Sequence, residues 1–198
     1  MPTAVTKGVL SVSAVLTLFL FMPALHPGDV LRARTPADPD PMQGRIEIAR
    51  QAAAVGAVDE AIRIYEEVLA EDPANDRAFW SLVRIYSSSD EYQERLLALL
   101  RDRLERMPND VQAKMELGNA LAGSGDHEGG HELWMEVLTT GPADAARYAE
   151  IGALEIRHRM YEHALETFLK GRAAFRSPSI LSQELTQVYA LMGDYESA

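Results

Sequence analysis

The sequence contains no cysteine among its 198 residues. This absence excludes disulfides, thiolate zinc sites, thiol nucleophiles and a lipidated cysteine anchor. The sequence also lacks a glycine-rich phosphate-binding loop and the G-x-S-x-G pattern of a serine nucleophile. The composition that remains, 47% hydrophobic and 25% charged, is that of a chain able to bury a core.

Positive charge is scarce, and the formal net charge is −11 at pH 7. The first 44 residues are balanced, with three basic and three acidic side chains, so the whole excess lies in the rest of the chain. A negative surface repels phosphate backbones, and nucleic acid is therefore not an expected partner. The same charge also keeps a soluble protein dispersed, which is the simplest interpretation of it.

Residues 1–25 place an apolar stretch behind a short positive start. Lys7 and the amino terminus precede the uncharged run Gly8–Met22, which reaches 18 residues when it is extended to Leu25. This pattern is typical of a signal peptide or of a short N-terminal membrane anchor. The candidate cleavage sites, near residues 24 and 33, are not clean, so cleavage and anchoring both stay open. A buried helix of the soluble part is a third alternative.

Residues 26–44 contain prolines at positions 27, 36, 39 and 41 among glycine and aspartate. Repeated proline bars a helix and favours an extended, semi-rigid linker. Little positive charge precedes the apolar run, so we expect the rest of the chain outside the cytoplasm, although Arg32 and Arg34 oppose this orientation. The expected location is periplasmic or membrane-anchored, or secreted if the N-terminal segment is cleaved.

A period of 34 residues runs through the remainder of the chain. Small or apolar residues recur at intervals of 35, 34, 34 and 34 residues, a large side chain follows the first four of them, and a proline follows the first three. The recurring residues are Ala61, Leu96, Gly130, Ala164 and Ala198; the large ones are Tyr65, Leu100, Trp134 and Phe168; the prolines are Pro73, Pro108 and Pro142.

This repeat resembles the tetratricopeptide (TPR) family, whose unit has a W-x2-L-G-x2-Y first helix and an A-x3-F second helix that ends near a proline. The third unit matches best, with Leu117 and Gly118 on its first helix and Gly130, Trp134 and Pro142 on and after its second. The resemblance implies an all-α fold, a TPR-type α-solenoid of antiparallel helix pairs with about four and a half repeats.

The apolar pattern agrees with the resemblance, which covers residues 42–198. Within residues 61–69, apolar side chains recur at i, i+3, i+4, i+7 and i+8, the stripe of an amphipathic helix. Such helix pairs bury their stripes by stacking, so we expect one repeat domain over residues 45–198, made of nine helical segments. The fifth unit stops where its second helix should begin. We expect a longer chain, a partner or a second copy of this chain to cover the face left open.

One catalytic pattern is present, because His127, Glu128 and His131 form an H-E-x-x-H sequence. In zinc hydrolases the two histidines bind the metal and the glutamate acts as general base, and Glu150 or Glu155 could supply a third ligand here. The pentapeptide, however, falls in register with the repeat and carries two adjacent glycines, which weaken a helix.

We therefore interpret the H-E-x-x-H sequence as a coincidence and expect neither a metal nor another cofactor. A zinc-dependent hydrolase stays the alternative function. Five methionines at apolar helical positions are interpreted as core side chains, and two further histidines as rim residues: Met107, Met115, Met135, Met160 and Met192, with His158 and His163.

In TPR arrays the residue after the small position of each first helix faces the inner groove, and the resemblance implies the same here. Two of these positions hold arginine, whose guanidinium binds carboxylates, and other groove-facing positions add two further arginines and one tryptophan. The candidate groove residues are Arg50, Arg77, Trp80, Arg84, Asn119 and Arg157, with Ala153 and Gln187 at equivalent positions. The alternative is that these are ordinary solvated arginines paired with neighbouring acids.

The predicted function is a non-catalytic protein–protein interaction scaffold of the cell envelope. The expected partner is a protein or an extended peptide, acidic or presenting its C-terminus, bound near the first two repeats. The lysine and asparagine pattern of the family's known carboxylate-binding groove is not reproduced, so its ligand does not transfer to this chain.

Overall fold

The computed structural model describes residues 41–193. The N-terminal segment 1–25 and residues 26–40 of the expected linker lie outside these described residues, as do residues 194–198. No helix of the described part has the length and apolar character that crossing a membrane requires. The expectations about export and anchoring therefore stay predictions.

Within residues 41–193 the chain forms nine α-helices and one short 3-10 helix, without a strand. This confirms the predicted all-α architecture and the predicted number of helical segments. In order, the elements are α1 (Pro41–Ala54), α2 (Val58–Glu71), α3 (Asp76–Tyr86), η3 (Asp90–Tyr92), α4 (Gln93–Arg106), α5 (Val111–Gly123), α6 (His127–Thr139), α7 (Ala145–Arg157), α8 (Tyr161–Phe175) and α9 (Ser182–Met192).

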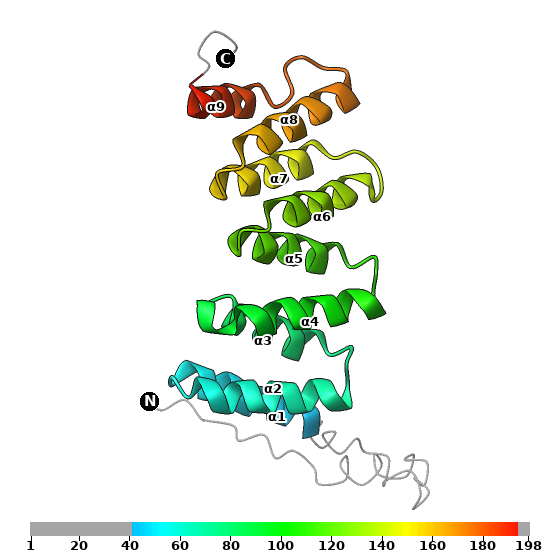
Figure 1. Cartoon of the computed structure of the whole chain (residues 1–198). Coiled ribbons are helices and arrows are strands. Elements are labelled where there is room, and N and C mark those ends of the chain that lie inside the picture. The colour runs from blue at the N-terminus through cyan, green and yellow to red at the C-terminus, as the bar shows by residue number, and fades with distance from the viewer. Residues whose placement is uncertain (1–40, 194–198) are drawn as a thin grey trace, which may run out of the picture. The chain divides into compact units, whose positions relative to one another are not determined.

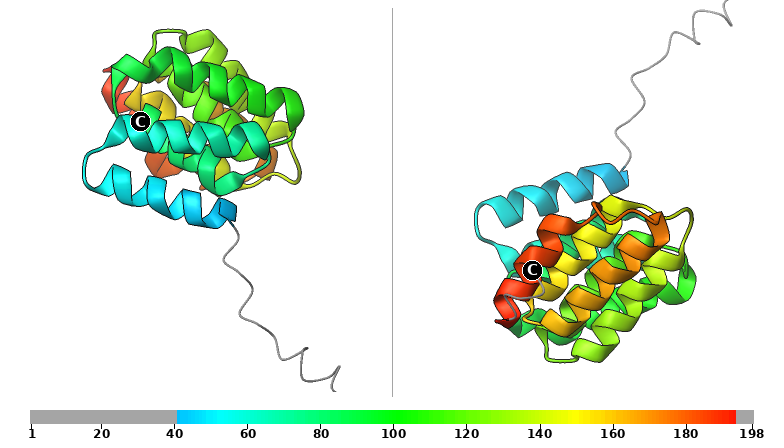
Figure 2. Two further views of the ribbon diagram at one scale, coloured as in Figure 1. Left: turned by 90° about the horizontal axis from the view of Figure 1, so that it is seen from below. Right: turned by 90° about the horizontal axis from the view of Figure 1, so that it is seen from above.

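The helices of the repeat region stack in chain order, each unit contributing a first and a second helix (Figure 1). Figure 2 looks along this stack from its two ends, with α1 and α2 nearest in the left view and α9 nearest in the right view. The first helices are α1, α3, α5, α7 and α9, and the second helices are α2, α4, α6 and α8. η3 occupies the turn that holds the one extra residue of the second unit.

The first helices of the middle units begin with the same device. Asn75, Asp110 and Asp144 are the N-cap residues of α3, α5 and α7, and each side chain accepts a hydrogen bond from a backbone N–H of the first turn. Such caps satisfy donors that have no partner inside the helix. Each cap follows the proline of the preceding unit by two residues. The first helix therefore begins at the same position in each of these units.

Small residues let the two helices of a unit approach closely, as the sequence predicts. A Cβ atom added to Gly118 on α5 would lie 2.5 Å from Nε1 of Trp134 on α6, and one added to Gly130 would lie 2.8 Å from the carbonyl oxygen of Gly118. Gly152 has the same relationship to the ring of Phe168 in the fourth unit. Trp134 and Phe168 fill the core beside these glycines and are almost completely buried.

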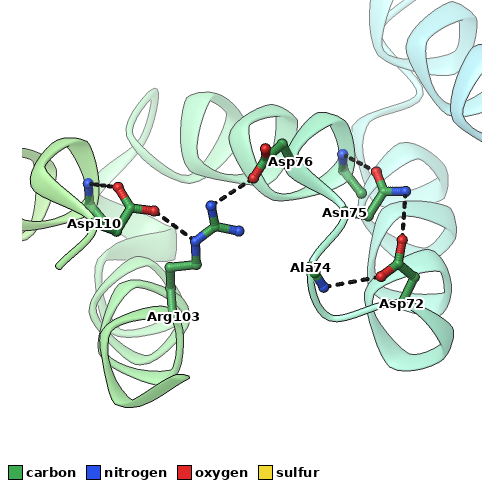
Figure 3. Close-up of polar contacts among 8 residues, drawn as sticks. Asp72, Ala74, Asn75, Asp76, Arg103 and Asp110 are labelled. Atoms are coloured by element: carbon green, nitrogen blue, oxygen red, sulfur yellow. Dashed lines mark hydrogen bonds and ion pairs between the residues drawn. The ribbon is translucent and has the colours of Figure 1, made fainter. Parts of the chain in front are cut away.

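A buried arginine ties the second unit to the third (Figure 3). Arg103 on α4 donates from Nη2 to Asp76 of α3 at 2.6 Å and from Nε to Asp110 at 2.8 Å. Its guanidinium also lies 4.7 Å from the ring centroid of Phe79. One side chain thus holds the N-terminal ends of two successive first helices.

Two expectations were wrong in detail. Residues 41–44 belong to α1 although they fall in the predicted extended linker, because proline at the first position of a helix loses no hydrogen bond. Met107 and Met192 are 43% and 39% exposed, since they lie at helix ends beyond the packed stripe. Only Met160 of the five methionines is fully in the core.

α9 forms the last described helix and packs on the fourth unit through Leu185 and Val188. Leu191 and Met192 on the same helix stay exposed. That another segment, a partner or a second copy of the chain covers this region stays a prediction.

Candidate interaction groove

A hollow of about 540 Å³ opens between α3 and α5. It brings together two of the residues selected from the sequence, Trp80 and Arg84, with Gln112 and Glu116 of the next unit. The remaining wall consists of Val83 at the end of α3 and of the serines that follow it, Ser87 and Ser88.

A second hollow of about 390 Å³ continues along the first helices from α5 to α7. It shares Gln112 and Glu116 with the first hollow and adds Arg147 and Glu150 of α7. The shared wall joins the two hollows into one trough, which runs over the second, third and fourth units. We call this surface, lined by α3, α5 and α7, the inner trough.

Trp80 supplies the apolar contact of the inner trough. Its ring is half-buried and lies edge-on to the buried ring of Phe79, with 4.8 Å between the ring centroids. Phe79 packs against one side of the Trp80 indole, and the exposed part of the indole lines the hollow. A preformed aromatic wall of this kind can bury an apolar side chain of a partner at little cost in conformational entropy.

The charges of the inner trough are mixed. Arg84 and Arg147 bring positive charge, and Glu116 and Glu150 bring negative charge. Burial raises the pKa of Glu116, and the nearby charge of Arg157 opposes that rise without cancelling it. The trough therefore offers both hydrogen-bond donors and hydrogen-bond acceptors to a partner. It is not the basic surface that the arginines of the sequence predicted.

The other selected residues lie outside the two hollows. The guanidinium of Arg50 is bound to Glu47 on its own helix at 2.6 Å, and Asn119 is hydrogen-bonded to Nε2 of His158 at 2.9 Å. Arg77 and Arg157 are exposed in the first turn of α3 and the last turn of α7. Ala153 on α7 and Gln187 on α9 are exposed as well.

Sequence reasoning missed Gln112 and Glu116, which form the wall shared by both hollows. A signal for them exists, since they precede Asn119 by seven and three residues and lie on the same helix face. Neither residue is an arginine or an aromatic residue, the types expected to contribute most to binding, so neither was selected from the sequence.

The H-E-x-x-H side chains lie in two different surroundings. His127 and Glu128 are exposed on the first turn of α6, whereas His131 is buried and its Nδ1 lies 2.6 Å from Oε1 of Glu155. No three metal-binding side chains come together anywhere in residues 41–193. Gly130 of the pattern serves the close packing of α6 on α5, so the repeat accounts for that residue.

Neither a family model nor a curated protein matches this sequence. Several solved structures do match the fold. A crystal structure of MamA protein has a TM-score of 0.56 and 18% identity, covering 78% of this chain and 84% of that one. MamA from Desulfovibrio magneticus has a TM-score of 0.51 and 20% identity, covering 70% of this chain and 77% of that one.

A tetratricopeptide repeat protein from Parabacteroides merdae has a TM-score of 0.57 and 17% identity, covering 80% of this chain and 62% of that one. These likenesses extend over most of the described helices and agree with the all-helical repeat fold. The chain has the fold of the tetratricopeptide-repeat proteins.

Proposed function

We propose that this protein is a non-catalytic interaction scaffold that binds an extended segment of a partner protein along the inner trough. The observation that carries the proposal is the wall of Gln112 and Glu116, which joins two hollows into a continuous surface over three successive units. An extended chain can follow such a surface and contact each unit in turn.

The lining residues define the chemistry of the bound segment. An apolar or aromatic side chain fits against Trp80, a carboxylate fits Arg84, and a donor such as lysine or an amide fits Glu116 and Glu150. The segment is therefore one of mixed polarity with an aromatic anchor. Its acidic groups belong beside Arg84, on the second unit.

Cross-linking in the living cell tests this proposal. A photoreactive residue placed at Ser88, on the trough wall, should capture a discrete partner, which mass spectrometry identifies. Trp80→Ala combined with Arg84→Glu should abolish this product, while Arg101→Glu on the exposed side of α4 should leave it unchanged. A product that survives the double change, or that is lost equally in the control, would rule out the inner trough as its binding site.

We also propose that the scaffold acts in the cell envelope, carried there by residues 1–25. The support is the positive start followed by an uncharged apolar run. A phosphatase reporter that is active only outside the cytoplasm, fused after residue 198, should be active with the full chain and silent without residues 1–25. Equal activity of both fusions would contradict export by this segment.

A further inference from the structure

A second candidate surface lies on the second helices α6 and α8, which do not line the hollow between α3 and α5. Rings of His131 on α6 and His163 on α8 have centroids 4.4 Å apart, and Nζ of Lys170 on α8 lies 3.7 Å from Sδ of Met135 on α6. These contacts show that α6 and α8 lie side by side although one helix separates them in the chain. Each carries a hollow on its exposed face, of about 410 and 450 Å³.

The two hollows have no lining residue in common, but their linings touch through Met135 and Lys170. Met135 belongs to the hollow on α6 and Lys170 to the hollow on α8, so their contact marks the line where the hollows meet. On α8 the floor is formed by Leu165, Leu169 and Ala173, and Leu169 is 40% exposed. We call this surface the outer groove.

Carboxylates line both sides of the outer groove. Glu132 and Glu136 stand on α6, and Glu162 and Glu166 stand on α8. The single cation of the lining, Lys170, is already bound to Glu166 at 2.7 Å, and Glu136 is bound to Lys114 of α5 at 2.6 Å. Within residues 41–193, Glu132 and Glu162 have no ion-pair partner.

The glutamates on the second helix of the first unit are all paired with arginine. On α2, Glu60 and Glu67 are both bound to Arg63, Glu66 is bound to Arg95, and Glu71 is bound to Arg45. Each glutamate of that second helix thus has an arginine beside it. α6 contains no lysine or arginine at all, and the charges of Glu132 and Glu162 are left for a partner to neutralise.

We propose that the outer groove binds a basic amphipathic helix of a partner protein. Its apolar stripe would cover Met135, Leu165 and Leu169, and its flanking lysine or arginine residues would face Glu132 and Glu162. The hollow on α8 extends from residue 162 to residue 173, about 16 Å at the rise of an α-helix, which a partner helix of roughly three turns would match. Anionic lipid and nucleic acid are poor candidates, because both would meet carboxylates.

A defined peptide tests the proposal directly. The probe is a synthetic peptide of roughly 14 residues with leucine at i, i+4, i+7 and i+11 and lysine on the flanks. The comparison peptide has the same composition with the leucines distributed around the helix. Fluorescence anisotropy with the full chain should show saturable binding of the first peptide, at least tenfold tighter than that of the second.

Charge reversal on the protein locates the site. Glu132→Lys with Glu162→Lys should weaken binding about tenfold or more, and Leu169→Ser should weaken it as well. The matched control, Glu94→Lys with Glu105→Lys, changes two exposed glutamates of α4 and should leave the affinity unchanged. Trp80→Ala with Arg84→Glu should also leave the affinity for the peptide unchanged, because those side chains belong to the inner trough. The experiment therefore tests the outer groove independently of the function proposed for the inner trough.

Three results would overturn the inference. The first is no saturable binding of the amphipathic peptide up to roughly 1 mM, the range of the weakest specific complexes. The second is equal binding of the two peptides, and the third is an equal loss in the α4 control. Either of the last two would show general attraction of a cationic peptide to an acidic protein. Apart from half-buried Trp80, the substituted side chains are exposed, and unchanged thermal unfolding checks that each variant is folded.

Discussion

Nδ1 of His131 lies 2.6 Å from Oε1 of Glu155 in the core, where α6 packs against α7. Glu155 is completely buried and His131 nearly so. Burial raises the pKa of Glu155 to about 8, and burial followed by the charge of His163 lowers the pKa of His131. Both shifts favour uncharged side chains, so a single proton is held between Nδ1 of His131 and Oε1 of Glu155.

This pair predicts a stability that falls as the pH rises above neutrality. The folded state keeps the Glu155 proton between pH 4.5 and about 8, where the unfolded chain has released it. His131 acts in the opposite sense only below pH 6.5, where the unfolded chain binds its proton first. Between pH 6.5 and 8 Glu155 alone of the two contributes, and the free energy of unfolding should fall by on the order of 1 kcal/mol per pH unit.

Urea unfolding at pH 6.5 and pH 8 measures this slope. Glu155→Gln keeps an amide beside His131 but has no proton to lose, so its unfolding midpoint should vary much less over the same interval. The charged neighbours Glu128, Glu166 and Lys170, and His163, are unchanged in that variant and serve as an internal control. A slope that persists in Glu155→Gln would assign the dependence to other groups.

Gly118→Ala should destabilise the protein by about 1–3 kcal/mol, the usual cost of overpacking a core. The added Cβ would lie 2.5 Å from Nε1 of Trp134, whose indole cannot move because the same nitrogen donates to the carbonyl oxygen of Met115 at 3.1 Å. Gly123→Ala on the same helix is the matched control, since its Cβ would meet only an atom of His158 at 3.7 Å. That change should be neutral or slightly stabilising in a denaturation curve.

The repeat period made the helices, their order and the glycine–aromatic pairs predictable. The helices and their order recur from unit to unit, and the glycine–aromatic pair occurs in the third and fourth units, so most positions are supported by others. Gly118 and Trp134 could be placed against each other because the family pattern and the 34-residue spacing agree. The interior departures from the pattern could not be predicted in this way, because each occurs once.

His131 and Glu155 are two residues that depart from the apolar pattern of the repeat. Other units have Ile62 and Leu165 at the position of His131, and Tyr86 and Leu121 at the position of Glu155. Two polar residues at apolar repeat positions thus meet across α6 and α7 and form a hydrogen bond. Comparing units position by position would have marked both residues as buried. It would also have given His131 a role other than that of a zinc ligand.

The inner trough was predictable only in part, for a different reason. Trp80 and Arg84 follow from the repeat register, but the depth of a hollow depends on the lengths of neighbouring side chains on two helices. Arg50 has the same register and is bound to Glu47 instead, which is the alternative that the sequence left open for these arginines. The repeat register predicts on which face of a helix a residue lies, and the neighbouring side chains determine whether that residue is available to a partner.

The two tryptophans should respond very differently to truncation. Trp134→Ala should cost about 3–5 kcal/mol, because the side chain is completely buried and leaves a cavity against Gly118. Trp80 is half-buried on the wall of the inner trough, so Trp80→Ala should cost about 1 kcal/mol or less and act mainly on partner binding. Comparing the urea midpoints of the two variants separates the core residue from the surface residue, and equal losses would contradict this assignment.

Arg103 provides the sharpest test of how the units are held together (Figure 3). Val68 and Val137 occupy its position in the first and third units, yet the guanidinium is accommodated because it donates hydrogen bonds to Asp76 and Asp110. Arg103 and Asp110 have only 6% and 12% of their side-chain surface exposed. Removing the arginine therefore leaves a poorly solvated carboxylate, which is the costly way to break an ion pair.

We predict that Arg103→Ala lowers the free energy of unfolding by about 3 kcal/mol. Arg106→Ala is the control on the same helix, since its pair with Asp102 is exposed and should contribute less than about 1 kcal/mol. Asp110→Asn should be intermediate, because the amide oxygen can still cap α5 through the N–H of Ala113 while the charge beside Arg103 is lost. A double-mutant cycle between Arg103 and Asp110 measures the coupling directly, and additive effects would show that the two side chains stabilise the junction independently.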